Sequence, residues 1–319
     1  MYSTSDYILE QDKMNYKKIT VLIVTYKQAG VIGRNLDSIL QQKEYGLHEI
    51  VICDDCSPDN NWDVIQEYVH ANPGLIRAYR NETNLGIYGN SDKCASLHGD
   101  ADLYCWLEGD DALCDGFFKA IQETIINQHI DVSLPIAIQA NYLAINPKGE
   151  RTRFFNDYIV KKKCNPISAK IRGLTTWRAS VFSQAVIKNF TPTVLNRGLA
   201  LAENLFDSQW FKYANYYYYI NVDGSIYYAG IGISVDLNGT RKEKWVKETV
   251  DKWNYLTENT LNDKKDRYYA KSQASYAQFQ LTHSLSDYLK LVIYYILGSA
   301  GYSMSLKGLL KSAKYIKQL

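Results

Sequence analysis

The sequence lacks the features that mark several common classes of protein. Its 319 residues carry a net charge of only +2, whereas dedicated nucleic-acid binders usually show a strong basic bias. It has no uninterrupted apolar run of about 20 residues, the length that crosses a bilayer. Residues 1–18 are polar and charged, which is unlike a secretory leader. We therefore expect a cytoplasmic protein with no nucleic-acid partner.

The sequence also lacks the two best-known nucleotide-binding motifs and a zinc-binding pattern. Neither a GxxxxGK loop nor a GxGxxG segment after a first strand is present. Cys53 and Cys56 have the spacing of a metal or redox pair, but no second such pair follows, which argues against zinc. Apolar residues make up 46% of the chain and charged residues 22%, as in a globular protein with a substantial core.

Strand and helix patterns alternate along the first third of the chain. Short β-rich runs are expected as strands at residues 19–24, 49–53, 75–79 and 103–107. Apolar residues at helical spacing lie between them, at residues 29–42, 62–69 and 90–97. This alternation predicts a parallel sheet covered by helices. Ligands of such sheets bind beyond the carboxyl ends of the strands.

The pattern changes after a further helix at residues 117–127. We expect strands within residues 132–145, 216–220 and 225–228, and helices at 175–188, at 204–213 and from residue 242 onward. This gives four predicted parts: an N-terminal tail at residues 1–16, an alternating α/β half at 17–125, a second half at 126–235 and a C-terminal helical extension at 236–319.

Four residues, Glu108-Gly109-Asp110-Asp111, follow the strand predicted at residues 103–107, and we call them the acidic loop. Three carboxylates this close repel one another unless a cation or ligand offsets their charge. Hard divalent ions prefer oxygen ligands. The loop therefore predicts a site for Mn²⁺ or Mg²⁺ that could in turn bind a diphosphate.

Five motifs in order resemble the family-2 glycosyltransferases. They are Val21-Leu22-Ile23-Val24-Thr25-Tyr26-Lys27-Gln28, Leu36-Asp37-Ser38-Ile39-Leu40-Gln41-Gln42, Glu49-Ile50-Val51-Ile52-Cys53-Asp54-Asp55-Cys56-Ser57, Asn84-Leu85-Gly86 and Glu108-Gly109-Asp110-Asp111, the last resembling the DxD element. The resemblance implies the GT-A fold, an α/β fold with a Rossmann-like, mostly parallel sheet flanked by helices, here with a C-terminal helical extension. It also implies that residues 17–125 form the nucleotide-sugar-binding half and residues 126–235 the acceptor-binding half.

The resemblance also implies a site for a nucleotide-sugar donor. Tyr26 could stack on the base and Asp54 could accept a hydrogen bond from a base imide. Asp110 would bind the metal, with Glu108 on the ribose or on the ion through water. The implied donor-binding residues are Thr25, Tyr26, Asp54, Asp55, Asn84, Lys93, Glu108, Asp110 and Asp111.

The catalytic base and the acceptor site are less well matched. The family's Glu-Asp-x-x-Phe stretch resembles Glu203-Asn204-Leu205-Phe206-Asp207, where the expected Asp is Asn204. An amide cannot serve as a general base, so Glu203 and Asp207 both remain candidates. Trp177 and Arg178 resemble part of an acceptor wall. Relatives also carry Arg or His after a Tyr-Tyr strand, whereas Tyr227-Tyr228 is followed by Ala229-Gly230.

The resulting interpretation is an inverting, metal-dependent transferase that favours a UDP-sugar. Its acceptor would be a glycan or a lipid-linked saccharide, in bacterial surface polysaccharide synthesis. A degenerate, scaffolding relative is the alternative, and a nucleotidyltransferase is a weaker one. The C-terminal segment, with lysines at 307, 311, 314 and 317, would either lie on the inner face of the plasma membrane or form an ordinary packed helix.

Overall fold

The structure is a computed structural model that describes residues 16–154, 166–171, 176, 178–190, 208, 210–230 and 240–299. The chain divides into two compact units. The first comprises residues 1–194 and 209–235, and the second comprises 195–208 and 236–319. Each unit is described by itself below.

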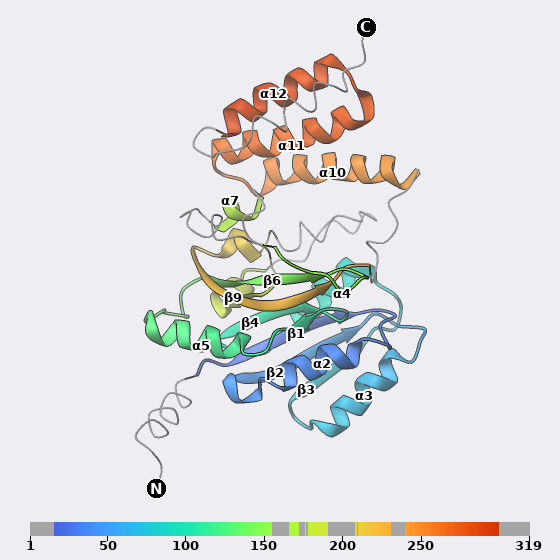
Figure 1. Cartoon of the computed structure of the whole chain (residues 1–319), viewed down its shortest axis with the longest axis vertical. Coiled ribbons are helices and arrows are strands. Elements are labelled where there is room, and N and C mark those ends of the chain that lie inside the picture. Colours follow the sequence, from blue (N-terminus) through green and yellow to red (C-terminus); the bar gives the residue numbers. More distant parts are fainter. Residues whose placement is uncertain are drawn as a thin grey trace. The chain divides into compact units, whose positions relative to one another are not determined.

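The described strands of the first unit form one nine-stranded sheet (Figure 1). Its order is β3-β2-β1-β4-β8-β6-β9-β5, with β7 paired to β6. The strands are β1 (Ile19–Thr25), β2 (Leu47–Asp54), β3 (Ile76–Arg80), β4 (Leu103–Glu108), β5 (Ala112–Leu113), β6 (Ile136–Ile145), β7 (Arg151–Arg153), β8 (Ser180–Ser183) and β9 (Tyr216–Tyr228). Strands β1 to β4 pair in parallel, whereas β8 pairs antiparallel with both β4 and β6.

Helices connect the parallel strands, as the alternating pattern predicted. The first unit contains α2 (Ile32–Leu40), η1 (Lys43–Tyr45), α3 (Asn61–Ala71), α4 (Gly86–Ser96), α5 (Phe117–Asn127), α7 (Pro166–Ile171) and α8 (Gln184–Ile187). The four parallel strands begin and end within two residues of their predicted ranges. Helix α4 begins at Gly86, four residues earlier than predicted.

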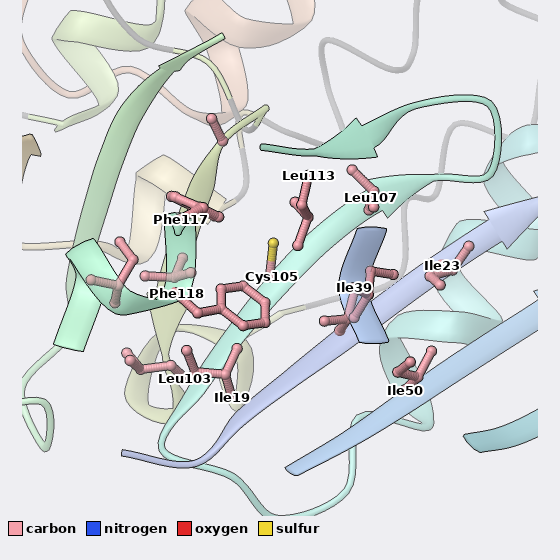
Figure 2. Packing of buried hydrophobic residues seen from close by; sticks show 14 of the residues in the cluster. Ile19, Ile23, Ile39, Ile50, Leu103, Cys105, Leu107, Leu113, Phe117 and Phe118 are labelled. Atoms are coloured by element: carbon pink, nitrogen blue, oxygen red, sulfur yellow. The ribbon is translucent and has the colours of Figure 1, made fainter. Parts of the chain in front are cut away.

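The main core lies between the sheet and helices α2 and α5. Figure 2 shows Ile23 of β1 close to Ile39 of α2, and Ile19 of β1 and Leu103 of β4 close to Phe118 of α5. Strand β1 is buried along its whole length, which explains its continuous apolar sequence. Burial of every residue of β1 means that both of its faces are covered, and α4 also contacts β1 and β2, with Cys94 donating to the Ile23 carbonyl.

The cysteines of the described residues are free thiols. Burial raises the pKa of the Cys105 thiol to about 12. Cys105 therefore stays neutral and acts as a small apolar core residue.

Two expectations for the later part of the first unit need correction. Residues 180–183, expected in a helix, form strand β8, which is fully buried between β4 and β6. Sheet pairing on both sides outweighs the helical spacing, and Val181 and Phe182 suit a buried strand. The two extended segments expected at 216–220 and 225–228 form one strand, β9.

The second unit is helical among its described residues. It contains α10 (Thr240–Asn259), α11 (Lys264–Thr282) and α12 (Leu285–Ser299). Asp263 caps α11 by accepting hydrogen bonds from the backbone N–H groups of Lys265 and Asp266. Within the described ranges, no helix has the length and apolar character needed to cross a membrane.

One face of α12 is apolar yet exposed. We call it the α12 stripe: Leu285, Leu289, Ile293, Ile296 and Leu297, with exposed fractions of 42–62%. These positions recur at intervals of three and four residues, so they share one face of the helix. A soluble packed helix normally turns such a face inward.

Candidate functional site

The carboxyl ends of β1, β2 and β4 bring the predicted donor residues to one edge of the sheet. In the parallel register, Thr25 lies beside Asp54, and Val24 lies beside Glu108. The side chains that follow these strands therefore gather in one place. This is the arrangement on which the donor-site prediction depends.

Asp54 is fully buried at this edge. Its Oδ1 accepts a hydrogen bond from Asn61 Nδ2 at 2.7 Å, and its Oδ2 accepts one from the Ser57 backbone N–H at 3.0 Å. Arg80 Nε lies 3.5 Å from the same Oδ2. A base could reach Asp54 only by displacing one of these donors. The predicted base contact of Asp54 stays a prediction, and the visible role of the carboxylate is to hold the loop after β2.

Asp55 has a different environment. Its Oδ1 accepts hydrogen bonds from Asn81 Nδ2 at 2.7 Å and from the Leu85 backbone N–H, at the start of α4, at 2.8 Å. Asn84 lies on the same loop, is exposed, and donates to the Asp55 carbonyl at 3.3 Å. Both of these hydrogen bonds use Oδ1, so Oδ2 of Asp55 can accept one from a ligand that reaches this edge, where the residue is 2% exposed.

The loops after β1 and β2 are tied together and locally strained. Lys27 and Cys56 each have φ of 56°, a left-handed conformation that is rare outside glycine. The Lys27 backbone N–H donates to Ser57 Oγ at 3.0 Å. Tyr26, in the loop after β1, is 39% exposed, so its ring is accessible for stacking. Thr25 is buried and donates to Gln28.

Lys93 is the predicted donor residue that the structure does not bring to this edge. It lies in the last turn of α4, whereas α4 begins beside Asp55. About 10 Å of helix separates the two ends, at 1.5 Å per residue. Its predicted diphosphate contact therefore has no geometric support.

Helix α2 holds the backbone of the acidic loop. Arg34 Nη2 donates to the Asp110 carbonyl at 2.8 Å. Asn35 Nδ2 donates to the Glu108 carbonyl at 2.8 Å and to the Asp111 carbonyl at 3.0 Å. Three carbonyls of the loop are thus fixed by two adjacent side chains.

Arg178 lies against the side chains of the same loop. Its Nη2 is 3.0 Å from Glu108 Oε2 and its Nε is 3.2 Å from Asp111 Oδ2. The structure therefore places Arg178 at the acidic loop; its predicted contact with an acceptor stays a prediction. Trp177, Glu203 and Asp207 lie outside the described residues.

The loop fits a divalent ion that is shared with a ligand. Among the described residues, no three His, Cys, Asp or Glu side chains converge as a complete metal cage. Mg²⁺ in phosphate-transfer sites is commonly held by only one or two carboxylates, with substrate phosphates and water completing its shell. Asp110, partly exposed in the middle of the loop, suits that smaller role.

Sequence reasoning missed the residues that support the site. They are Arg34, Asn35, Asn61, Arg80, Asn81 and Asn90, whose side chains bond to the strand-end loops or to one another. Asn61 and Asn81 are almost fully buried. Asn61 begins helix α3 and Asn81 directly follows strand β3. A buried amide costs energy unless it has hydrogen-bond partners, so amides at the ends of apolar runs were the available signal.

Together the fold and the site describe an α/β protein whose polar side chains gather at the carboxyl ends of the parallel strands of a mixed sheet. Residues 20–185 match the family described as glycosyl transferase family 2. The chain belongs to this family, as its motifs predicted.

Solved structures have the same fold. The chain superposes on S. aureus TarS, residues 1–349, in complex with UDP-GlcNAc, with a TM-score of 0.60 at 14% identity; the match covers 94% of this chain and 88% of that one. The mannosyltransferase PcManGT from Pyrobaculum calidifontis, in complex with GDP-Man and Mn²⁺, gives a TM-score of 0.50 at 12% identity, covering 95% and 81%. The predicted GT-A fold is confirmed.

Curated relatives match over a shorter stretch. The processive diacylglycerol beta-glycosyltransferase of Mycoplasma pneumoniae is 28% identical over 120 residues, which is 37% of this chain and 35% of that protein. The putative glycosyltransferase EpsE of Bacillus subtilis is 28% identical over 94 residues, or 30% and 33%. The chain thus spans about a third of the length of the curated relatives it matches.

Proposed function

We propose that this chain is a glycosyltransferase that moves a sugar, with inversion, from a nucleotide-sugar donor to a glycan or lipid-linked acceptor. A UDP-sugar is the favoured donor. The observation that carries the proposal is the convergence of Tyr26, Asp55 and the acidic loop at the ends of three adjacent parallel strands. TarS with UDP-GlcNAc and PcManGT with GDP-Man support this class of ligand.

In this proposal each strand end has one task. The exposed ring of Tyr26 stacks on the base. Asp55 Oδ2 accepts the base N–H, since the Asp54 carboxylate is already committed to Asn61 and Ser57. Asp110 binds Mn²⁺ or Mg²⁺, and Glu108 lies beside it.

A divalent ion bound at Asp110 would supply positive charge to the departing diphosphate. The protein's own contribution is to fix the acidic loop through Arg34 and Asn35, so that the nucleotide-sugar donor binds in one orientation. The proton of the acceptor hydroxyl passes to Glu203 or Asp207, which remain the two candidates for the base.

We further propose that the α12 stripe contacts an anionic membrane surface. Its five apolar side chains are exposed on one helix face, and the sequence after α12 carries lysines at 307, 311, 314 and 317. Apolar burial combined with basic charge is the usual basis of interfacial binding. Such contact would place the enzyme beside lipid-linked acceptors of surface polysaccharide synthesis, on the inner face of the plasma membrane.

A panel of nucleoside diphosphates and nucleotide sugars, with and without Mn²⁺, tests the donor proposal. Thermal stabilisation and slow donor hydrolysis are measured, and neither needs an acceptor. We expect Mn²⁺-dependent stabilisation by one nucleotide class and slow hydrolysis of its sugar. Binding without hydrolysis would favour the scaffold alternative, and no binding at all would contradict the proposal.

A further inference from the structure

Arg178 contacts two carboxylates of the acidic loop. It bridges them with different nitrogens, Nη2 to Glu108 and Nε to Asp111. The arginine side chain is only 16% exposed, and those of Glu108 and Asp111 are 18% and 2% exposed. Ion pairs this far from solvent are screened less than surface pairs, so the positive charge acts strongly on the loop.

Two consecutive tyrosines of β9 hold the arginines at the loop. The Arg178 guanidinium carbon lies 4.6 Å from the centre of the Tyr227 ring, and that of Arg34 lies 3.5 Å from the centre of the Tyr228 ring. Successive strand residues point to opposite faces. Tyr227 therefore supports Arg178, which contacts side chains of the acidic loop. Tyr228 supports Arg34, which contacts the backbone of the loop.

The charge balance of the loop has a consequence for ion binding. Arginine remains protonated at any physiological pH. Its fixed cation offsets the repulsion between Glu108 and Asp111, and it also disfavours a second cation nearby. A diphosphate brings negative charge that would offset this penalty.

We propose that Arg178 is a positioning residue that makes metal binding depend on the nucleotide. By holding Glu108 and Asp111, it keeps them from gathering around a free ion. The loop then has low affinity for Mn²⁺ alone and high affinity for Mn²⁺ together with a nucleoside diphosphate. This inference rests on the proposed donor site and deepens it.

The test measures Mn²⁺ affinity by the electron paramagnetic resonance of free Mn²⁺, with and without UDP or whichever diphosphate the panel selects. In the Arg178→Gln protein we expect Mn²⁺ alone to bind about tenfold more tightly. Because the nucleotide-bound affinity changes less, the enhancement by nucleotide shrinks by a similar factor. Arg178→Lys keeps the charge but cannot bridge both carboxylates, so its affinity for Mn²⁺ alone should fall between those of wild type and Arg178→Gln.

Arg153→Gln is the matched control, because Arg153 forms an exposed ion pair with Asp223 at 2.7 Å. Should Arg178→Gln fail to fold, Tyr227→Leu removes the ring beside the guanidinium and should move the affinity in the same direction, whereas Tyr227→Phe should not. Unchanged or weaker binding of Mn²⁺ alone in the folded variants overturns the inference only. Absence of nucleotide-dependent Mn²⁺ binding in the wild type overturns the proposed function as well.

Discussion

At the residue scale, two adjacent carboxylates at the end of β2 have different surroundings. Asp54 bonds within its own loop and to Arg80, and its side chain is wholly buried. Asp55 bonds through Oδ1 to Asn81 and to the start of α4. Substitution of each should therefore change a different property of the protein.

Asp54→Asn should lower stability by about 2 kcal/mol, because hydrogen bonds to charged groups contribute about 1.5–3 kcal/mol each. Asp55→Asn should instead weaken binding of the preferred nucleotide and reduce its discrimination from the other bases. Urea unfolding and nucleotide titration of both variants measure the two effects. If the Asp54→Asn protein were as stable as wild type but had lost its base selectivity, the base contact would be assigned to Asp54 and not to Asp55.

Asp110→Asn should abolish the effect of Mn²⁺ on nucleotide binding. We expect a loss of about 100-fold or more in metal-dependent affinity, since mutating a residue that only hydrogen-bonds to a metal ligand already lowers metal affinity by about 10–100-fold. Asp115→Asn is the control, because Asp115 is exposed and lies outside the loop. Calorimetric titration of UDP with and without Mn²⁺ gives the result, and equal affinities for wild type and Asp110→Asn would exclude the metal role.

The acids of this site could be predicted from the sequence because each follows a buried strand directly. Their supporting residues could not. Arg34 and Asn35 lie on a helix whose pattern predicts only its buried apolar face, and nothing in it indicates the loop they contact. Arg178 is distant in sequence from Glu108, and only the pairing of β8 with β4 brings the two together.

At the scale of elements, the acidic loop packs closely against the loop after β1. A Cβ added at Gly109 would lie 2.9 Å from Thr25 Cβ and also meet the Gln28 side chain. Only glycine allows this approach, so the position of the loop depends on a missing side chain.

Gly109→Ala should displace the loop and reduce turnover by on the order of 100-fold, the typical cost of a small misplacement in a catalytic site. Gly30→Ala is the control, because an added Cβ there meets nothing within 4 Å. Turnover and Mn²⁺-dependent nucleotide affinity are measured together. A Gly109→Ala protein with wild-type values of both would show that the loop tolerates the shift.

Strand β8 shows where reading elements from sequence fails. A strand of four residues is too short to establish a period, and the surrounding apolar residues fit a helix equally well. Its identity comes from β4 and β6, which pair with it on both sides. The four parallel strands were predictable because their runs are longer and separated by helices.

At the scale of the whole molecule, the C-terminal unit carries the α12 stripe. Replacing Leu289, Ile293 and Ile296 with serine should reduce binding to vesicles that contain anionic lipid by at least about tenfold, because burying each such side chain contributes about 1.5–3 kcal/mol. Melting temperature should stay unchanged, since these side chains are 50–62% exposed.

Leu134→Ser provides the comparison for that experiment, as Leu134 is 41% exposed in the other unit. Co-sedimentation with vesicles and gel filtration are run in parallel. Wild-type protein that stays in the supernatant would contradict the membrane proposal. A serine variant that changes its oligomeric state instead would assign the stripe to self-association.

The pairing of β9 with β6 makes the candidate site sensitive to deletions some distance away. Around Asn141 the register shifts, and β9 accommodates extra residues relative to β6. A deletion that this irregular stretch cannot absorb would turn Tyr227 and Tyr228 to each other's faces. The contacts of these tyrosines with Arg178 and Arg34 therefore depend on the length of a stretch in which no residue need touch a substrate.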